Sequence, residues 1–185
     1  MAGIKSEVLI DDIRLVTSVL QGDVDSFSVI VNKYELMILK FVYNMIKQKE
    51  AAEDITQEVF ITIYNKLYMY DKKHSFSNWI LQISKNKCID YMRKYNKGYE
   101  SDIDEEYNVS SKDMSPEEVA EYNETKLTIK KYINTLEETD KQILILRYSQ
   151  NLTFIDIAEV LNLTESTVKR RYYKVRENYK DFATK

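Results

Sequence analysis

Basic side chains gather in two short segments of this chain, a pattern typical of proteins that contact phosphates. Residues 84–97 carry five Lys or Arg against one Asp, and residues 165–176 carry five against one Glu, so each segment has a formal net charge of +4. The whole chain has a formal net charge of −3, because residues 98–124 hold ten acidic residues against one Lys, a net −9. Local cationic surfaces attract nucleic acid even where the average charge is negative. The charge pattern therefore favours a nucleic-acid-binding protein with an acidic connector.

Few residues of this chain are of the types that carry out catalysis. His74 is the only histidine and Cys88 the only cysteine, which excludes an intrachain disulfide and leaves a zinc site, a pair of histidine ligands or a Ser-His-Asp triad without support. The three glycines are isolated, so no phosphate-binding loop is present. Glu53 and Asp54 are adjacent and would point in different directions from a helix. We expect a protein that is not an enzyme and that needs no metal or cofactor.

The composition predicts an all-α fold. Hydrophobic residues make up 44% of the chain, enough for packed cores, while three Gly and one Pro are too few for a turn-rich β fold. Residues 1–10 lack the basic start and apolar run of a signal peptide, and no stretch approaches the roughly 18 apolar residues of a membrane helix. We expect a soluble cytoplasmic protein without direct membrane insertion.

Apolar residues recur at helical spacing in three segments of the first half, residues 25–45, 51–67 and 77–95. A polar loop at residues 70–75 separates the last two, and Trp79 is expected in the core. We predict a helical domain over residues 11–97 and an acidic linker over residues 98–115, where the periodicity is lost.

A second helical domain is predicted over residues 116–182. Ser115 precedes Pro116, so the serine can cap a helix that reaches about Thr135. Thr139 with Gln142 and Thr153 with Asp156 have the spacing of capping boxes, and each pair predicts the start of a short helix.

The end of this domain has the pattern of a helix-turn-helix. The helix that begins at Thr153 breaks at residues 162–164, and a strongly basic helix starts near Glu165. In a helix-turn-helix the second helix lies in the major groove, where cations contact phosphates and Arg can contact guanine. Its inner stripe of Val168, Tyr172 and Val175 leaves Lys169, Arg170, Tyr173 and Lys174 on the outer side. The simpler alternative is an ordinary solvated basic face.

Four segments resemble bacterial RNA polymerase sigma factors of the extracytoplasmic-function (ECF) type. Residues 25–34, residues 52–60 (Ala-Glu-Asp-Ile-Thr-Gln-Glu-Val-Phe) and residues 76–86 (Phe-Ser-Asn-Trp-Ile-Leu-Gln-Ile-Ser-Lys-Asn) resemble the second conserved region of sigma factors. Residues 136–179 resemble the fourth region, with Ile-Ala-Glu and Thr-Val-Lys at its most recognisable positions. No third folded domain separates the two halves, which is typical of the ECF group.

The resemblance implies a set of contacts with core RNA polymerase and promoter DNA. The β′ clamp helices would be bound by Asp54, Gln57, Glu58 and Phe60, although Phe60 could equally belong to the core. The −10 element would be opened and read by Tyr70, Lys72, Lys73, His74, Lys85, Asn86, Lys87, Arg93 and Lys94, with a flipped base held in the loop at residues 70–75. The −35 element would be read by Arg147, Thr167, Lys169, Arg170, Arg171, Tyr173 and Lys174. Arg170 departs from the small residue common there, so we predict no promoter sequence.

Three further partners or roles follow from the resemblance. The C-terminal domain would be held by the β-subunit flap, and an anti-sigma factor wedged between the two domains would regulate the chain. The acidic linker would either enter a cationic channel of the polymerase or act as a plain solubilising tether.

Two alternatives to a sigma factor remain. One is a stand-alone helix-turn-helix activator, which would need neither the motif at residues 54–60 nor that at residues 76–86. The other is a helical adaptor between proteins.

Overall fold

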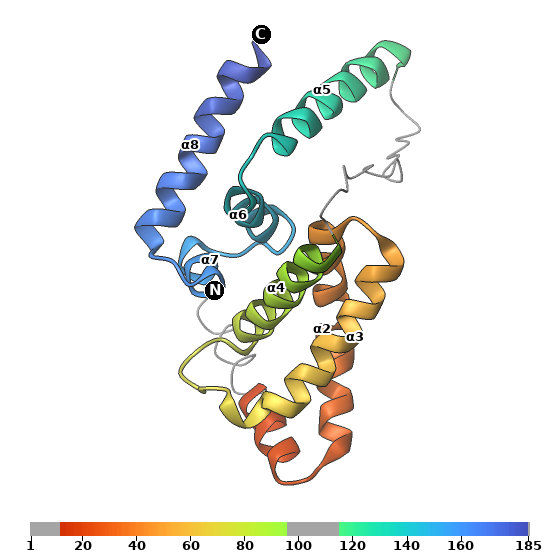
Figure 1. Cartoon of the computed structure of the whole chain (residues 1–185), viewed down its shortest axis with the longest axis vertical. Coiled ribbons are helices and arrows are strands. Elements are labelled where there is room, and N and C mark those ends of the chain that lie inside the picture. Colours follow the sequence, from red (N-terminus) through yellow and green to blue (C-terminus); the bar gives the residue numbers. More distant parts are fainter. Residues whose placement is uncertain (1–11, 96–114, 185) are drawn as a thin grey trace.

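The computed structural model describes residues 12–95 and 115–184, and all regular structure in these ranges is helical (Figure 1). After a first helix at residues 12–20, the elements are α2 (Val24–Ile46), α3 (Lys49–Lys66), the 3₁₀ turn η1 (Leu67–Met69), α4 (Phe76–Tyr95), α5 (Pro116–Asn134), α6 (Glu138–Tyr148), α7 (Phe154–Leu161) and α8 (Glu165–Ala183). The all-α prediction is confirmed, and the helices expected at residues 25–45, 51–67 and 77–95 agree with α2, α3 and α4 to within two residues at each end. Residues 98–114 of the predicted linker lie outside the described residues.

Helices α2, α3 and α4 pack together as the N-terminal domain. Their inward faces bury large apolar side chains such as Phe41 and Phe76. The first helix is fastened to α2 through Asp12, which accepts hydrogen bonds from Lys33 Nζ at 2.8 Å and Tyr34 Oη at 2.7 Å. Asp12 is almost fully buried, so this ionised pairing offsets the cost of removing a carboxylate from water.

Two of the three predicted caps in the C-terminal domain are confirmed. Ser115 and Thr153 both form complete capping boxes, at the starts of α5 and α7. The predicted box of Thr139 with Gln142 is wrong, because α6 begins at Glu138, two residues earlier than a cap at Thr139 would place it, and its N-cap, Glu137, makes no side-chain hydrogen bond. Gln142 instead donates from Nε2 to Glu138 one turn back, at 3.3 Å.

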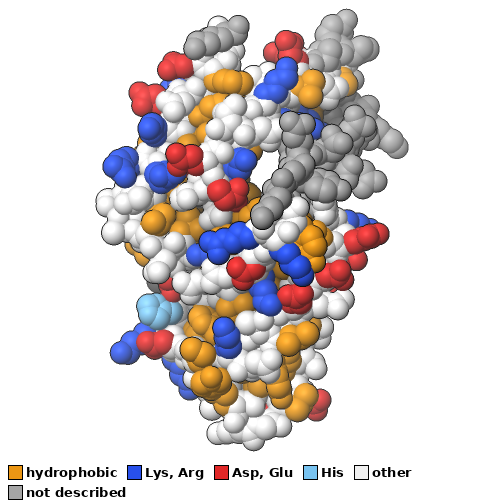
Figure 2. Space-filling model, viewed as in Figure 1, with side chains coloured by type: hydrophobic (Ala, Val, Ile, Leu, Met, Phe, Trp, Pro, Cys, Tyr) orange, Lys and Arg blue, Asp and Glu red, His pale blue; other side chains and the backbone are white. Residues whose placement is uncertain are grey.

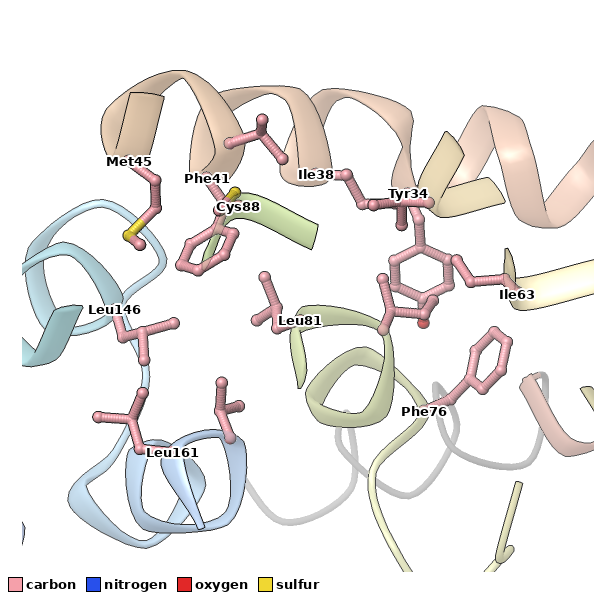
Figure 3. Close-up of a cluster of buried hydrophobic side chains, with 14 of the residues drawn as sticks. Tyr34, Ile38, Phe41, Met45, Ile63, Phe76, Leu81, Cys88, Leu146 and Leu161 are labelled. Atoms are coloured by element: carbon pink, nitrogen blue, oxygen red, sulfur yellow. The ribbon is translucent and has the colours of Figure 1, made fainter. Parts of the chain in front are cut away.

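The two domains lie directly against each other. Helix α4 packs on α7, and α2 packs on α6. Figure 3 shows Met45 and Leu81 of the N-terminal domain facing Leu146 and Leu161 of the C-terminal domain, and all four belong to one continuous cluster of buried apolar residues. Burying apolar surface between the domains stabilises this closed arrangement.

Candidate nucleic-acid interface

The helix-turn-helix forms as predicted because each end of its turn is capped. Helix α7 ends at Asn162, which has the left-handed conformation (φ 59°) that Asn tolerates better than most residues. Thr164 then caps α8 by accepting the backbone N–H of Thr167 at 3.2 Å. Val168 and Tyr172 fix the inner face of α8 in the core. Helix α8 is thereby held against α7 with a defined outer face.

Most of the predicted contacts on α8 are available to DNA. The side chains of Lys169, Arg170, Tyr173 and Lys174 are all exposed on its outer side. Lys169 pairs with Glu165 one turn back at 2.6 Å, an exposed ion pair that a phosphate can replace at little cost. This face combines three cations with an aromatic side chain, which suits phosphate contact and base-edge contact in a major groove.

Three other predicted −35 residues have structural partners inside the domain. Arg171 binds Glu137 and also donates from Nε to Asp140 Oδ1 at 2.7 Å, and these bonds to carboxylates raise the pKa of its guanidinium. Arg147 donates to the carbonyl of Leu152 at 2.6 Å and lies 4.9 Å from the ring of Phe154, so it holds the loop before α7. Thr167 takes part in the cap of α8, with its Oγ1 2.8 Å from that of Thr164.

The loop at residues 70–75 presents some of its predicted residues and buries one. Tyr70 is 7% exposed, packs edge-on against Phe76 and donates from Oη to the carbonyl of His74 at 2.6 Å. Burial raises the pKa of its hydroxyl to about 12. Tyr70 is therefore part of the loop's frame, and its ring is not free to stack on a base. Lys72 and Lys73 are exposed on the same loop.

Helix α4 distributes its predicted −10 residues over different faces. Asn86 is exposed, whereas Lys85 is 9% exposed and donates from Nζ to the carbonyl of Val160 in α7 at 3.2 Å. Lys87 points toward α3, where its Nζ lies 2.9 Å from Glu58. Near the end of α4, Arg93 and Lys94 are exposed. Neighbouring positions on a helix differ by 100° in direction, so one basic run cannot form a single flat surface.

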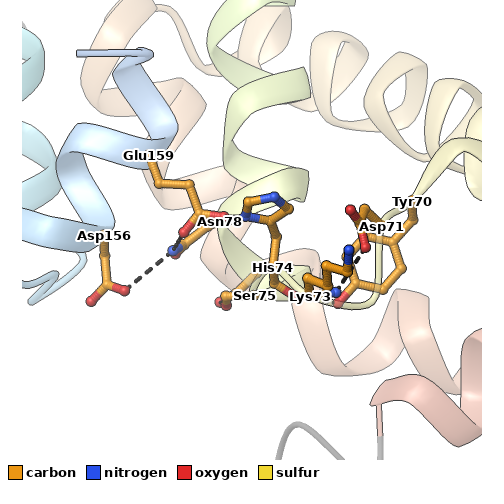
Figure 4. A network of polar contacts seen from close by, with 9 residues as sticks. Tyr70, Asp71, Lys73, His74, Ser75, Asn78, Asp156 and Glu159 are labelled. Carbon is orange, nitrogen blue, oxygen red and sulfur yellow. Dashed lines mark hydrogen bonds and ion pairs between the residues drawn. The ribbon is translucent and has the colours of Figure 1, made fainter. Parts of the chain in front are cut away.

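Asn78, which was not among the residues predicted from the sequence, lies at the centre of a polar network between the domains. Its side chain is 2% exposed, and Nδ2 donates to Glu159 Oε2 at 2.7 Å and to Asp156 Oδ1 at 3.2 Å. Figure 4 shows Asn78 and His74 facing these two acids of α7. A polar residue between the buried Phe76 and Ile80 was the signal in the sequence, because buried polar groups need a partner.

The residues predicted to bind polymerase lie on α3. Asp54, Gln57 and Glu58 are exposed, but Phe60 is 8% exposed and belongs to the core. An aromatic ring that packs inside the domain cannot insert into a pocket of a partner. Beside these side chains, a groove of about 810 Å³ runs between the start of α3 and the end of α4. Its lining includes Asp54 and Glu58, so the carboxylates lie at the edge of a concave surface.

The described residues hold no cluster of three or more metal-ligating side chains. Among the helices at residues 12–95 and 115–184, none combines the length and apolar character that crossing a bilayer requires.

Figure 2 shows Lys, Arg, Asp and Glu side chains interspersed on the visible face, with hydrophobic side chains gathered at its lower end.

Comparisons with known proteins agree with this arrangement. The family model for Sigma-70 region 2 matches residues 30–98, and that for Sigma-70 region 4 matches residues 126–178. The ECF RNA polymerase sigma factor SigW of Bacillus subtilis (strain 168) is 32% identical over 172 residues, which covers 89% of this chain and 92% of SigW. The RNA polymerase sigma-H factor of Pseudomonas aeruginosa is 29% identical over 174 residues, 90% of each chain.

Solved structures share the fold. CnrH, in complex with the cytosolic domain of CnrY, superposes with a TM-score of 0.69 at 16% identity and covers 94% of this chain and 97% of its own. The sigma factor RpoE, in complex with the anti-sigma factor NepR from Bartonella quintana, gives a TM-score of 0.64 at 15% identity, with 85% of this chain and 96% of RpoE covered. Since a relative of similar length, two family models in the expected order and the helix-turn-helix geometry agree, this chain belongs to the ECF sigma factors, which direct promoter-specific transcription by RNA polymerase.

Proposed function

We propose that the N-terminal domain of this sigma factor binds the β′ clamp helices and reads the −10 element, while the C-terminal domain reads the −35 element. The observation that carries the proposal is the outer face of α8, where Lys169, Arg170 and Lys174 are exposed on the second helix of a helix-turn-helix. The acids on α3 support the proposed contact with the clamp helices, because Asp54 and Glu58 would meet a basic partner at the edge of a groove.

The two domains would act together on polymerase. Each holds DNA weakly, and the attachment of both to one enzyme raises the effective concentration of each for its own element. The domains reach the two elements only if they separate, because α4 and α7 are in contact in the closed chain. Core polymerase would supply that separation by binding the domains at different places, the β flap holding the C-terminal one.

The first test is run-off transcription with purified core polymerase and a pool of genomic promoters. We expect transcripts that depend on the added chain, and their start sites identify the two elements. A chain that binds duplex DNA without core enzyme and yields no run-off product would instead be a stand-alone activator.

A second test addresses the polymerase contact. Asp54→Ala with Gln57→Ala is expected to weaken binding to core enzyme about tenfold or more, because exposed polar side chains at the centre of an interface are lost. Glu124→Ala, at an exposed acid of α5, is the matched control and leaves binding unchanged. Equal binding by the double variant and the control places the contact elsewhere.

A third test addresses promoter opening. Asn86→Ala is expected to leave assembly with core enzyme intact and to slow promoter opening, because an amide that contacts an unpaired base is lost. Permanganate footprinting of unpaired thymines measures this rate. Unchanged opening would remove Asn86 from the −10 site.

We also propose an anti-sigma factor as a partner. CnrH and RpoE, two structures with this fold, are complexes with a cytosolic domain and with an anti-sigma factor respectively. In this chain α4 and α7 pack directly, so a partner cannot lie between them as the closed domains stand. An anti-sigma factor would bind the outer faces of the closed pair or separate its domains. Cytoplasmic localisation belongs to the same proposal.

A further inference from the structure

Three hydrogen-bond donors of the N-terminal domain converge on α7 of the C-terminal domain. Asn78 donates to Glu159 at 2.7 Å and to Asp156 at 3.2 Å, and His74 Nδ1 lies 3.0 Å from Glu159 Oε1. About two turns of helix further on, Lys85 donates to the carbonyl of Val160 at 3.2 Å. Every donor in this set belongs to α4 or to the loop before it, and every acceptor belongs to α7. Figure 4 shows His74 and Asn78 beside Asp156 and Glu159.

These donors have the chemistry that binds a nucleic-acid strand. An ammonium and an imidazole contact phosphates, and a side-chain amide matches the edge of an unpaired base. The acceptors offered by α7 are two carboxylates, which resemble a phosphate in charge and hydrogen bonding, and one neutral backbone carbonyl. Helix α7 therefore lies on α4 in the place of an anionic ligand.

Lys85 indicates that α7 is an imperfect ligand for this surface. Its ammonium donates to a neutral carbonyl oxygen and is 9% exposed. Desolvation lowers the pKa of this group, since burial disfavours the charged form. A phosphate at this position would stabilise the buried ammonium better than a carbonyl does.

We propose that His74, Asn78 and Lys85 form a receptor for the opened promoter strand, and that Asp156 and Glu159 of the helix-turn-helix domain occupy it in the free chain. This proposal rests on the assignment of −10 reading to the N-terminal domain. It adds Asn78 to the residues that contact DNA, and it makes α7 an internal competitor of the promoter. The free chain then binds single-stranded DNA poorly, and separation of the domains on polymerase uncovers the receptor.

Apolar packing also holds the closed arrangement together, and the polar network fixes how α7 is oriented on α4. Leu146 and Leu161 pack into the cluster that contains Leu81, which holds the domains together without specifying their register. The polar pairs fix which side of α7 faces α4, because a shift of one residue would leave the buried Asn78 without acceptors. When only a fraction of chains is open, the apparent dissociation constant for the strand rises by the inverse of that fraction.

The test compares charge reversal at Glu159, in the contact between the domains, with the same reversal at Glu124, outside it. Glu159→Lys puts an ammonium in place of the carboxylate that Asn78 and His74 contact and should separate the domains, whereas Glu124→Lys makes the same change on α5, away from the interface. Binding of a fluorescein-labelled single-stranded DNA of about 20 nucleotides is measured by anisotropy on the full chain. The radius of gyration is measured by small-angle X-ray scattering. We expect Glu159→Lys to bind the strand about tenfold more tightly than Glu124→Lys, with an increased radius of gyration, for a closed state populated about nine times in ten.

A second variant separates the receptor role of Asn78 from its role in closure. Asn78→Ala removes hydrogen bonds to α7 and should increase the radius of gyration, but it also removes a DNA contact, so binding of the strand should stay well below that of Glu159→Lys. Equal binding by the two variants would overturn the assignment of Asn78. An unchanged radius of gyration in Glu159→Lys, or an increase without tighter binding than Glu124→Lys, would overturn the competition.

A negative result for competition by α7 can be distinguished from failure of the proposed function. Run-off transcription by the unaltered chain with core polymerase tests −10 and −35 recognition without reference to α7. In the assembled holoenzyme the domains are already separated, so Glu159→Gln should give the same run-off yield as the unaltered chain. A lower yield for Glu159→Gln would place Glu159 in the active complex and contradict its role as a competitor.

Discussion

The two DNA-reading regions carry similar charge in sequence but are covered differently in the fold. On α8 the side chains of Lys169, Arg170 and Lys174 face away from the protein. On α4 the side chain of Lys85 is buried against α7, and Lys87 is paired with Glu58. Two segments that each have a net charge of +4 therefore differ in what they offer to DNA. The availability of a basic segment is decided by the elements that pack on it.

This difference in coverage predicts the order in which the chain would contact the two promoter elements. On the proposed function, the face of α8 would meet duplex DNA in the closed chain, whereas Asn78 and Lys85 would meet DNA only when α7 leaves α4. A chain built this way would contact the −35 element without rearrangement and the −10 element after it. The comparison can be tested at the contact between the domains and on each basic face.

The largest expected effect is a loss of stability when a side chain is truncated in the core that the two domains share. Leu146 is fully buried in the cluster that also contains Leu81. Leu146→Ala removes three buried methyl or methylene groups, and such truncations cost about 2–5 kcal/mol in the free energy of unfolding. Urea unfolding followed by circular dichroism measures this loss.

The control for this variant is Leu127→Ala, at an apolar side chain of α5 that is 55% exposed. Because little surface is buried there, the control should lie within about 0.5 kcal/mol of the unaltered chain. A similar loss in both variants would mean that Leu146 is not part of a shared core.

Helix positions and caps were predictable from the sequence because they depend on local pattern. The periodicity of residues 25–45 predicted α2, and the box of Thr153 with Asp156 predicted the start of α7. The box of Thr139 with Gln142 failed because the same helix starts two residues earlier, with Glu137 as its N-cap. Several residues in a short polar segment can serve as a helix start, and packing decides among them.

The functional residues were predictable only where a side chain points to solvent whatever the tertiary fold. Lys169 and Arg170 follow from the stripe on α8, since the opposite face must be buried. The burial of Tyr70 depends on how its loop folds onto Phe76 of α4, and the ion pairs of Arg171 depend on residues of another helix, far away in sequence. A single helical pattern contains no information about those neighbours.

Two adjacent arginines on α8 give the next largest effect, because Arg170 is exposed whereas Arg171 is paired with Glu137 and Asp140. Arg170→Ala is expected to leave stability unchanged and to cost about 1–3 kcal/mol in binding to a preferred −35 duplex if this arginine contacts a guanine. Arg171→Ala breaks the pairs with Glu137 and Asp140 and should lower stability by about 1 kcal/mol.

Thermal unfolding and duplex binding of both variants are compared at one salt concentration. For Arg171→Ala, the fraction of folded protein is matched before binding is measured. If Arg171→Ala then loses as much affinity as Arg170→Ala, the side chain of Arg171 leaves its acidic partners to bind DNA.

A smaller effect is expected from the lysines of α8, and it appears in the salt dependence. Lys169→Ala with Lys174→Ala should reduce the slope of log K against log salt for duplex binding by about 0.9 per lost phosphate contact. The matched variant is Lys126→Ala with Lys131→Ala on α5, which leaves the slope unchanged. Equal slopes for both double variants would move the phosphate contacts off the outer face of α8.

The smallest expected effect is local and depends on pH. Glu118 completes the capping box of α5 by accepting the backbone N–H of Ser115 at 2.7 Å, and this hydrogen bond lowers the pKa of its carboxyl group. A carboxyl whose pKa is lower in the folded chain stabilises the fold above its unfolded pKa, and this contribution is lost as the pH falls through the folded value. We therefore expect the first turn of α5 to fray in mild acid. Amide chemical shifts of residues 117–120 followed between neutral pH and pH ~3 measure the transition. Glu118→Gln can keep the same hydrogen bond without titrating, so a shift change of equal size in that variant would assign the transition to another group.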